Sequence, residues 1–319
     1  QLSVITDDLT VFIMNIEALS TKRGYDFAYK FLLKNQTLVC VDESTTIKNH
    51  SAQRTKNILK LSQHAKYKRI MTGSPVTKSP LDLFSQVQFL DPWLLDQQSY
   101  YSFRARYAVI VQRSVGTHSF QHIVKYQRLD ELQEKIQHFS TRVLKSDCLD
   151  LPEKVYTKRS VSLTSEQVKA YTEMKKAAIT FFDENVMTAA SVLTQMIRLH
   201  QIICGHVKTD DGEVKSIKSN RIKELLEVLE ETNGKVIIWA VYRYDIQQIE
   251  KTLGDKYGKE SVATYYGDTK DSIRQSIVDR FMDPDDPLRF FVGNPKTGGY
   301  GLTLTSSHTV VYYSNDYSL

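Results

Sequence analysis

The chain has 319 residues, 41% of them hydrophobic and 25% charged, which is typical of a soluble globular protein with two domains. No apolar run reaches the roughly 18 residues that a membrane span requires, so we expect no membrane partner. The three cysteines, Cys40, Cys148 and Cys204, lie far apart and the eight histidines are scattered, which excludes a zinc-type cluster and favours reduced core thiols in a cytosolic protein. The first residue is not Met, and we expect an internal fragment.

The net charge of +5 is unevenly distributed. Asp and Glu are absent from residues 44–81 and again from residues 97–129, although both stretches contain several Lys and Arg. The second stretch also interleaves aromatic residues with its basic ones, namely Tyr100, Tyr101, Phe103, Tyr107, Phe120 and Tyr126. Such stretches suit a polyanion such as nucleic acid. The alternative is a solvated basic face that acids elsewhere in the fold balance.

Short apolar runs alternate with amphipathic stretches at the start of the chain. Residues 11–14, 38–41 and 69–72 predict buried strands, and residues 51–64 predict a helix between the last two. This alternation favours parallel strands joined by helical crossovers.

The middle of the chain has a different pattern. Residues 79–158 contain helical patches, at 81–91 and 130–139, and few strand signals. Residues 151–152 predict a linker, and a long helical region opens at residues 164–166, where Thr164 or Ser165 supplies the cap.

A second alternating series follows. Its predicted helices and strands alternate at residues 222–229, 236–241, 246–253, 262–266, 273–281, 290–292 and 309–313. The chain therefore predicts two parallel-sheet modules, in which ligands bind beyond the carboxyl ends of the strands.

Two adjacent carboxylates, Asp42 and Glu43, follow a predicted strand. In phosphoryl transfer, Asp42 would hold Mg²⁺ through water and Glu43 would orient and deprotonate the attacking water. The alternative is an ordinary loop start.

Two further loops also follow strands. Thr72, Gly73 and Ser74 can contact both the acidic pair and a neighbouring domain, or form an ordinary turn. Residues 293–302 follow a strand and open a helix, where backbone N–H groups can hold phosphates. Gly299 stands where a P-loop has its Lys, so the chain contains no Walker A motif.

In this order and at these separations, the segments resemble the Swi/Snf-related branch of superfamily 2 helicases. Residues 42–49 resemble motif II, which commonly reads Asp-Glu-Ala-His before a Lys-Asn pair, and residues 71–75 resemble motif III. Further similar segments are residues 15–19, 81–84, 89–92, 199–204, 236–242 (motif IV), 298–305 (motif V) and 313–317 (the approach to motif VI). The Ser-Thr in place of Ala-His is most similar to phage or viral members.

The resemblance implies an α/β fold with two RecA-like parallel-sheet domains of the P-loop NTPase class. Residues 1–150 would form the first, N-terminally truncated domain, with a helical protrusion from about residue 80. Residues 151–319 would form a helical segment and the second domain. Motifs I and VI would lie outside the chain, and we expect these 319 residues alone to hydrolyse ATP poorly. The expected compartment is the cytoplasm (of the host for a phage protein), or the nucleus for a eukaryotic one.

The implied function is ATP-dependent translocation on double-stranded DNA, with ATP and Mg²⁺ as cofactors. The implied site residues are Asp42 and Glu43 (catalysis), Thr72, Gly73 and Ser74 (coupling), Gly298, Gly299, Gly301 and Leu302 (nucleotide cleft, motif V), and Lys48, Asn49, Arg54 and Thr297 (DNA). Thr303 replaces the common Asn of motif V, which puts a role for that side chain in doubt.

Two other functions fit the sequence. One is a different superfamily 2 enzyme, such as a restriction-system motor or an RNA helicase. The other is a non-catalytic module that only binds nucleic acid, against which the intact pair of Asp42 and Glu43 argues.

Overall fold

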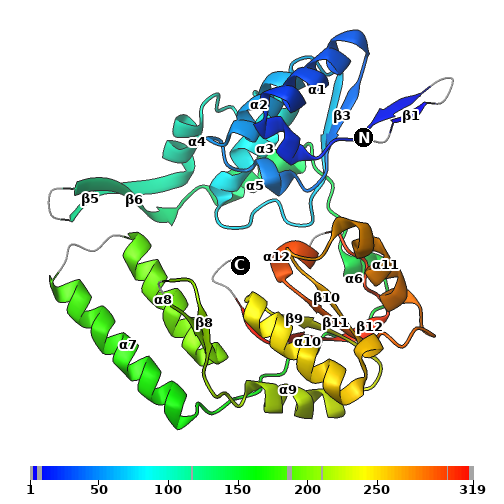
Figure 1. Cartoon of the computed structure of the whole chain (residues 1–319). Helices are drawn as coiled ribbons and strands as arrows, with labels where there is room; N and C mark the ends of the chain where they lie inside the picture. The colour runs from blue at the N-terminus through cyan, green and yellow to red at the C-terminus, as the bar shows by residue number, and fades with distance from the viewer. Residues whose placement is uncertain are drawn as a thin grey trace. The chain divides into compact units, whose positions relative to one another are not determined.

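The computed structural model of the chain describes residues 3–5, 9–115, 118–184, 189–209, 211–299 and 301–315. The chain divides into two compact units, unit 1 (Gln1–Pro152) and unit 2 (Glu153–Leu319) (Figure 1). The boundary predicted after residue 150 lies close to this division. Within the described ranges, no helix is both long and apolar enough to cross a membrane.

Unit 1 combines short strands with helices, and most of its predicted elements form. In chain order the elements are β1 (Ser3–Ile5), β2 (Thr10–Phe12), the 3₁₀ helix η1 (Ile16–Ser20), α1 (Lys22–Lys34), β3 (Leu38–Val41), η2 (Ser44–Ile47), α2 (Gln53–Ser62), β4 (Tyr67–Ile70), η3 (Pro80–Asp82), α3 (Leu83–Leu90), α4 (Tyr100–Tyr107), β5 (Ala108–Val115), β6 (His118–Tyr126), α5 (Leu129–Gln137) and α6 (Lys145–Cys148).

Strands β3 and β4 pair in parallel, with Val41 opposite Ile70, and helix α2 connects them. The predicted strand–helix–strand order over residues 38–72 is therefore confirmed. One face of the pair packs on a core that includes Leu19, Leu32, Ile47, Leu61 and Phe89. Each such side chain contributes roughly 1.5–3 kcal/mol when it is fully buried.

The prediction of a mainly helical region between residues 79 and 158 is wrong in one part. Helices α3 and α5 form where expected, but β5 and β6 make an antiparallel hairpin between α4 and α5. The β-branched run Val109, Ile110 and Val111 explains the strand, because such side chains pack well on a pleated surface. The basic and aromatic composition of this stretch obscured that pattern in the sequence.

A charged network joins α4 to α5. Nε and Nη2 of Arg106 donate to the two carboxylate oxygens of Glu131 at 2.8 and 2.7 Å, and the Tyr107 hydroxyl donates to Oε1 at 2.8 Å. Hydrogen bonds from Arg106 and then Tyr107 lower the pKa of Glu131 to about 2. Burial, followed by the bond to Glu131, raises the pKa of Tyr107 to about 12.

Unit 2 begins with two long helices and continues as a second strand–helix series, as predicted. Its elements are α7 (Ser165–Glu184), α8 (Ala189–Cys204), β7 (His206–Lys208), β8 (Val214–Ser216), α9 (Arg221–Glu230), β9 (Lys235–Trp239), α10 (Arg243–Tyr257), the 3₁₀ helix η4 (Lys259–Ser261), β10 (Val262–Tyr265), α11 (Asp271–Met282), β11 (Phe290–Gly293), α12 (Pro295–Gly298) and β12 (Ser307–Tyr312).

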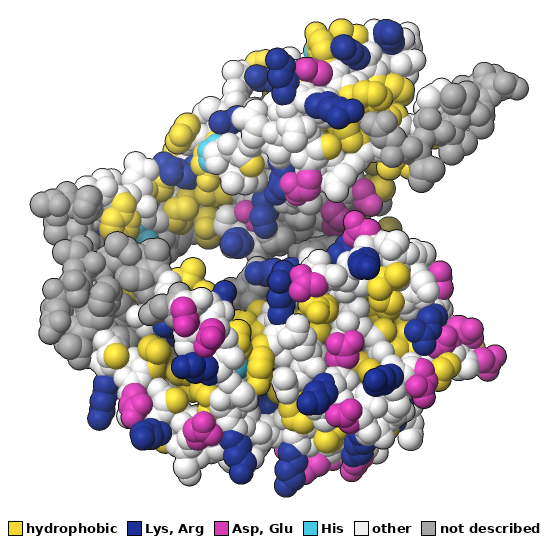
Figure 2. Space-filling view, viewed as in Figure 1, with side chains coloured by type: hydrophobic (Ala, Val, Ile, Leu, Met, Phe, Trp, Pro, Cys, Tyr) yellow, Lys and Arg dark blue, Asp and Glu magenta, His cyan; other side chains and the backbone are white. Residues whose placement is uncertain are grey.

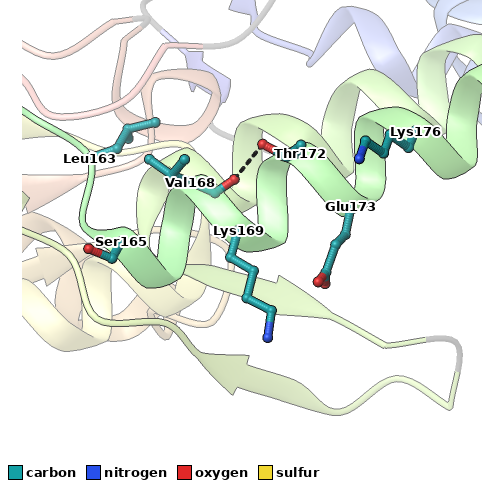
Figure 3. Close-up of a pocket in the computed structure, with 7 residues that line it drawn as sticks. All are labelled: Leu163, Ser165, Val168, Lys169, Thr172, Glu173 and Lys176. Atoms are coloured by element: carbon teal, nitrogen blue, oxygen red, sulfur yellow. Dashed lines mark hydrogen bonds between the residues drawn. The ribbon is translucent and has the colours of Figure 1, made fainter.

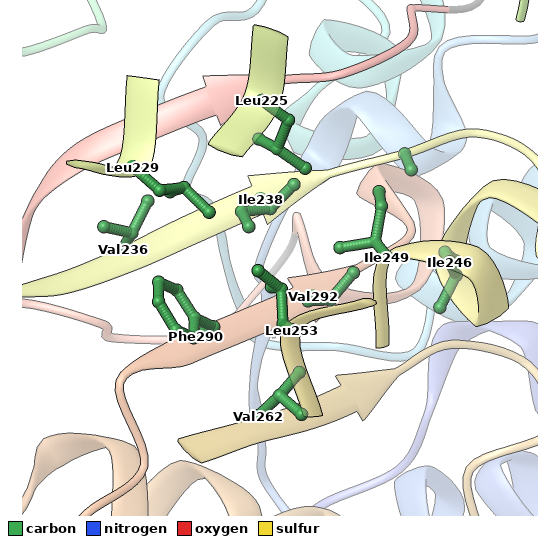
Figure 4. Packing of buried hydrophobic residues seen from close by; sticks show 11 residues of the cluster. Leu225, Leu229, Val236, Ile238, Ile246, Ile249, Leu253, Val262, Phe290 and Val292 are labelled. Atoms are coloured by element: carbon green, nitrogen blue, oxygen red, sulfur yellow. The ribbon is translucent and has the colours of Figure 1, made fainter. Parts of the chain in front are cut away.

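Four strands of unit 2 form one sheet in the order β10-β11-β9-β12, and every neighbouring pair is parallel. Alternate residues of β9 serve opposite faces. Val236 and Ile238 pack beneath α9 and α10 (Figure 4), whereas Ile237 and Trp239 pack with α11 on the other side. The prediction of an α/β chain with parallel sheets is confirmed.

The loop after β11 lies against the indole of Trp239. A Cβ added to Gly293 would lie 2.7 Å from Cζ3 of Trp239, and one added to Gly298 would lie 3.0 Å from Cη2. Real Cβ atoms do not approach other carbons this closely, so glycine is required at Gly293 for close packing. The glycine loop after β11 and the Trp239 end of the central strand β9 therefore pack in close contact.

We expect Glu131→Gln to weaken unit 1 in a pH-dependent way. The pKa of Glu131 lies below its ordinary value of 4.5 in the folded chain, so its contribution is present above about pH 4.5 and is lost as pH falls toward 2. In urea unfolding followed by circular dichroism, the variant should therefore unfold at lower urea than the wild type at pH 7. This difference should shrink below pH 4.5. The exposed Glu134→Gln on the same helix is the control, and an equal effect of both substitutions would contradict the prediction.

We expect Gly293→Ala to lower the free energy of unfolding of unit 2 by about 1–3 kcal/mol, the usual cost of overpacking. Gly254→Ala within α10 is the matched control, because its added Cβ has no neighbour nearer than 3.8 Å and Ala favours a helix. Adding Trp239→Phe to Gly293→Ala should recover part of the loss, since the clashing ring is then shorter. Urea titrations measure all three variants, and equal stability of the two alanine variants would contradict the prediction.

Candidate functional site

The acidic pair lies where the sequence predicts it, directly after β3. Asp42 and Glu43 are both exposed, and Oδ1 of Asp42 accepts a hydrogen bond from the backbone N–H of Glu43 at 2.9 Å. Glu43 adopts a left-handed backbone, with φ 47° and ψ 55°. Such a conformation costs a non-glycine residue roughly 1–3 kcal/mol and concentrates at functional sites.

The loop that follows β4 is hydrogen-bonded to the loop that follows β3. The Met71 N–H donates to the Val41 carbonyl at 2.9 Å, and the Ser44 N–H donates to the Met71 carbonyl at 3.0 Å. The predicted coupling residues Thr72, Gly73 and Ser74 come next, and the Ser74 N–H donates to the Thr72 hydroxyl at 3.3 Å. The structure therefore brings the acidic pair and the coupling loop to one edge of the sheet in unit 1.

A buried glutamine that the sequence did not reveal joins these two loops. The Ser44 hydroxyl donates to Oε1 of Gln86 at 2.7 Å, and Nε2 of Gln86 donates to the carbonyls of Pro75 and Asp82 at 2.8 Å each. Ser44 and Gln86 are fully buried. A polar residue on the apolar face of the predicted helix 81–91 was the available signal.

Asp82 fixes the end of the coupling loop. Its Oδ2 accepts hydrogen bonds from the backbone N–H groups of Thr77 and Lys78 at 3.0 and 2.8 Å, and from the Thr77 hydroxyl at 2.9 Å. Burial acts to raise the pKa of Asp82, but the hydrogen bonds from Lys78 and Thr77 lower it overall. The carboxylate therefore stays charged and holds the turn.

The three candidate DNA-contact residues of unit 1 each form bonds within the unit. Nζ of Lys48 contacts the Thr77 hydroxyl, which ties it to the coupling loop. Asn49 accepts from the N–H and hydroxyl of Ser51 at 3.0 and 2.8 Å. Arg54 donates to the Thr46 carbonyl at 2.8 Å and pairs with Glu17. These bonds shape the segment after the acidic pair, and DNA contact by these residues stays a prediction.

The motif V residues lie at the carboxyl end of β11 in unit 2. Asn294 anchors this loop, because its Nδ2 donates to the Val241 carbonyl after β9 at 2.8 Å and its Oδ1 accepts from the Lys296 N–H at 2.9 Å. Thr297 and Gly298 belong to the short helix α12, and both N–H groups donate to the Asn294 carbonyl.

The remaining motif V residues follow α12 in the chain. Gly299 has an exposed backbone, and Gly301 has a φ of 72°, a conformation that favours glycine. Leu302 packs on the core beside Trp239. Tyr300 of the predicted motif lies outside the described residues, as do Asp316 and Tyr317 of the segment that approaches motif VI.

A buried polar cluster, made of His206, Asp245 and Ser314, was also not foreseen. Oδ1 of Asp245 lies 3.2 Å from Nδ1 of His206, and its Oδ2 accepts from the Ser314 hydroxyl at 3.2 Å. The Ser314 hydroxyl in turn accepts from the Val241 N–H at 2.9 Å. Three separate segments therefore meet at the carboxyl ends of β9 and β12.

Groups beside this cluster are held in their neutral forms. Burial, and then the charge of Arg221, lowers the pKa of His200. Burial raises the pKa of the Cys204 thiol to about 12, so this cysteine is an inert core residue. Burial, together with the charge of Arg221 in the case of His200, therefore favours the neutral forms of these two side chains. Cys40 and Cys148 are exposed, so the prediction of core thiols is wrong for these two.

The two units differ in net charge. Residues 1–152 contain 20 Lys and Arg against 14 Asp and Glu, whereas residues 153–319 contain 22 against 23. On the visible face, acidic side chains are sparse over unit 1 and frequent over unit 2 (Figure 2). The positive charge of the chain therefore belongs to unit 1.

Among the described residues, neither the depression on α7 nor any metal cluster marks another site. A shallow depression follows the first turns of α7 and is lined by Leu163, Val168, Thr172 and their helical neighbours (Figure 3). The Thr172 hydroxyl there donates to the Val168 carbonyl at 2.7 Å, so it is an ordinary helix surface. The described residues contain no group of three or more His, Cys, Asp or Glu side chains suited to a metal ion.

Comparison with known proteins finds relatives along nearly the whole chain. YwqA of Bacillus subtilis, provisionally named an ATP-dependent helicase/translocase, is 25% identical over 96% of this chain and 33% of its own length. The chromatin-remodeling complex subunit snf22 of Schizosaccharomyces pombe is 24% identical over 91% and 19%. The bovine DNA annealing helicase and endonuclease ZRANB3 is 24% identical over 88% and 25%. The chain spans a third or less of the length of these relatives.

A solved structure, the SWI2/SNF2 ATPase core of Sulfolobus solfataricus in complex with double-stranded DNA, is 24% identical with a TM-score of 0.45 and covers 91% of this chain and 61% of that one. Among protein families, the SNF2-related domain matches residues 5–208 and the helicase conserved C-terminal domain matches residues 217–319. These two matches follow the order of the motifs along the chain. The chain therefore belongs to the SNF2-related family of helicase-like proteins.

Proposed function

We propose that this chain provides most of an ATP-driven motor that moves along double-stranded DNA. The observation that carries the proposal is the edge of the unit 1 sheet, where Asp42 and Glu43 are hydrogen-bonded through Ser44 and Met71 to the loop of Thr72. Because the acidic pair is hydrogen-bonded to a second polar loop, a change in the ATP phosphates beside the acidic pair can shift that loop and so alter the surface that it forms. The names of the relatives, which include helicases and a chromatin-remodeling subunit, support the same activity.

Asp42 fits a hydrated magnesium ion. Its carboxylate is exposed at a strand end, and Mg²⁺ in such sites uses one or two carboxylates together with water and substrate phosphates. When bound with ATP, Mg²⁺ supplies charge neutralisation on the phosphates. Beside it, Glu43 would orient the attacking water and accept its proton.

Double-stranded DNA is the proposed partner, and unit 1 is the proposed main contact. Its excess of Lys and Arg suits the phosphate backbone, which gives sequence-independent and salt-sensitive binding. The motif V loop of unit 2, with Gly298, Gly299 and Gly301, is a second proposed nucleotide-binding element, because backbone N–H groups at a strand end can hold phosphates.

We expect Glu43→Gln in the full-length protein to reduce duplex-stimulated ATP hydrolysis by about 100-fold or more, as loss of a general base does. Binding of duplex DNA should persist, because the substitution removes no cation. Phosphate release measures hydrolysis, and Glu134→Gln on α5 is the control for loss of an exposed carboxylate. Comparing duplex DNA, single-stranded DNA and RNA as stimulators tests the substrate.

Three results would contradict the motor proposal. They are a wild-type protein without nucleic-acid-stimulated hydrolysis, a stronger response to RNA than to duplex DNA, and full hydrolysis by Glu43→Gln. The first result would leave a module that only binds nucleic acid.

We expect Gln86→Ala to uncouple hydrolysis from DNA. The substitution leaves the Ser44 hydroxyl and the Pro75 carbonyl without their buried partner, which costs roughly 1–3 kcal/mol of stability. Because this bridge joins the two loops, stimulation by DNA should fall roughly ten-fold while the KM for ATP changes little. The exposed Gln133→Ala on α5 is the control. Unchanged stimulation per folded molecule would reduce Gln86 to a purely structural residue.

A further inference from the structure

The β5–β6 hairpin projects from unit 1 as an exposed ribbon (Figure 1). Its base is anchored, because Ala108 is buried and Ile123 and Tyr126 pack on the core around Phe103. Farther out, the described side chains at positions 111–114 and 119–122 are all exposed. The outer half of the hairpin therefore adds nothing to the core of the unit.

The two faces of this outer half differ in chemistry. On one face the cross-strand pairs are Gln112 with Gln121 and Ser114 with Ser119, and hydrogen bonds link them, including Gln112 Nε2 to the Ser119 hydroxyl at 2.6 Å. The ribbon's own side chains on this face are uncharged and hydrogen-bonded, and the side-chain oxygen of Gln121 also accepts from the Arg104 guanidinium of α4.

The opposite face pairs Val111 with His122 and Arg113 with Phe120. Phe120 is 47% exposed, and the Arg113 guanidinium makes no hydrogen bond or ion pair with any described residue. We call this the Phe120 face. It combines an exposed aromatic ring with an unneutralised cation.

The charge around the Phe120 face selects an anionic partner. Residues 97–129 contain no Asp or Glu, so nothing within the hairpin neutralises Arg113 or the nearby Lys125. A cation beside an exposed aromatic ring is the pairing that single-stranded nucleic acid favours, because phosphates meet the cation while a base stacks on the ring. Within a continuous duplex the base faces are already stacked, so a phenyl ring can stack on them only at the cost of unstacking a base step.

We propose that the Phe120 face binds DNA where a duplex gives way to unpaired bases, with Phe120 stacking on an unpaired base and Arg113 contacting a phosphate. This inference rests on the proposed DNA motor and adds the structure of the DNA that the motor engages. The neutral face, with Gln112 and Ser114, points away from this contact.

The test is binding of the full-length protein, without nucleotide, to a Y-shaped DNA and to a blunt duplex of the same paired sequence, by gel-shift titration. We expect Phe120→Ala to weaken binding to the Y-shaped DNA roughly ten-fold and to change binding to the blunt duplex little. Phe120→Trp should retain the affinity of the wild type, because its ring also stacks. Arg113→Gln should weaken binding to the Y-shaped DNA and lower the salt dependence by about one phosphate contact.

Gln112→Ala on the neutral face is the matched control and should bind as the wild type does. The proposal is overturned if Phe120→Ala binds the Y-shaped DNA as tightly as wild type, or if it weakens binding to both DNAs equally. Binding without nucleotide is independent of hydrolysis. A wild type that prefers the Y-shaped DNA but lacks ATPase activity would therefore contradict the motor and leave this contact intact.

Discussion

The hydrogen bonds between β3 and β4 decide where unit 1 carries its functional groups. Parallel strands end at the same edge of a sheet, so Val41 opposite Ile70 makes Asp42 and Thr72 neighbours although they are distant in sequence. The bonds of Met71 and Ser44 continue this pairing into the two loops. Gln86 then fills the space beneath them with three hydrogen bonds, so neither loop can shift without breaking a buried contact.

In unit 2, the loops at the strand ends are held in place by close packing and by a buried carboxylate. Trp239 at the end of the central strand accepts the glycine loop against its ring, which only residues without a Cβ allow. Asp245 in the first turn of α10 contacts both His206 of β7 and Ser314 after β12. A carboxylate at a helix N-terminus is favoured by the backbone N–H groups there. The segment after β12 is thereby held beside the segment after β9.

The sequence predicted what depends on near neighbours in the chain. Apolar runs located β3, β4 and β9 to β12 to within a few residues, and the acidic pair and the glycine loop lie at strand ends as expected. What it did not predict depends on distant pairs. Ser44 and Gln86 are 42 positions apart, and Asp245 and Ser314 are 69 apart, so no local pattern marks them. The β5–β6 hairpin was not predicted for another reason, because its frequent basic and aromatic residues masked its short β-branched run.

The position of Trp239 makes the motif V loop observable without a label. The chain has two tryptophans, and Trp93 lies in unit 1 with 66% of its surface exposed, whereas Trp239 is buried in unit 2 under Gly293 and Gly298. Replacing Trp93 with Phe would leave one tryptophan, in van der Waals reach of the loop. Its emission would then be sensitive to how closely these glycines pack on the indole.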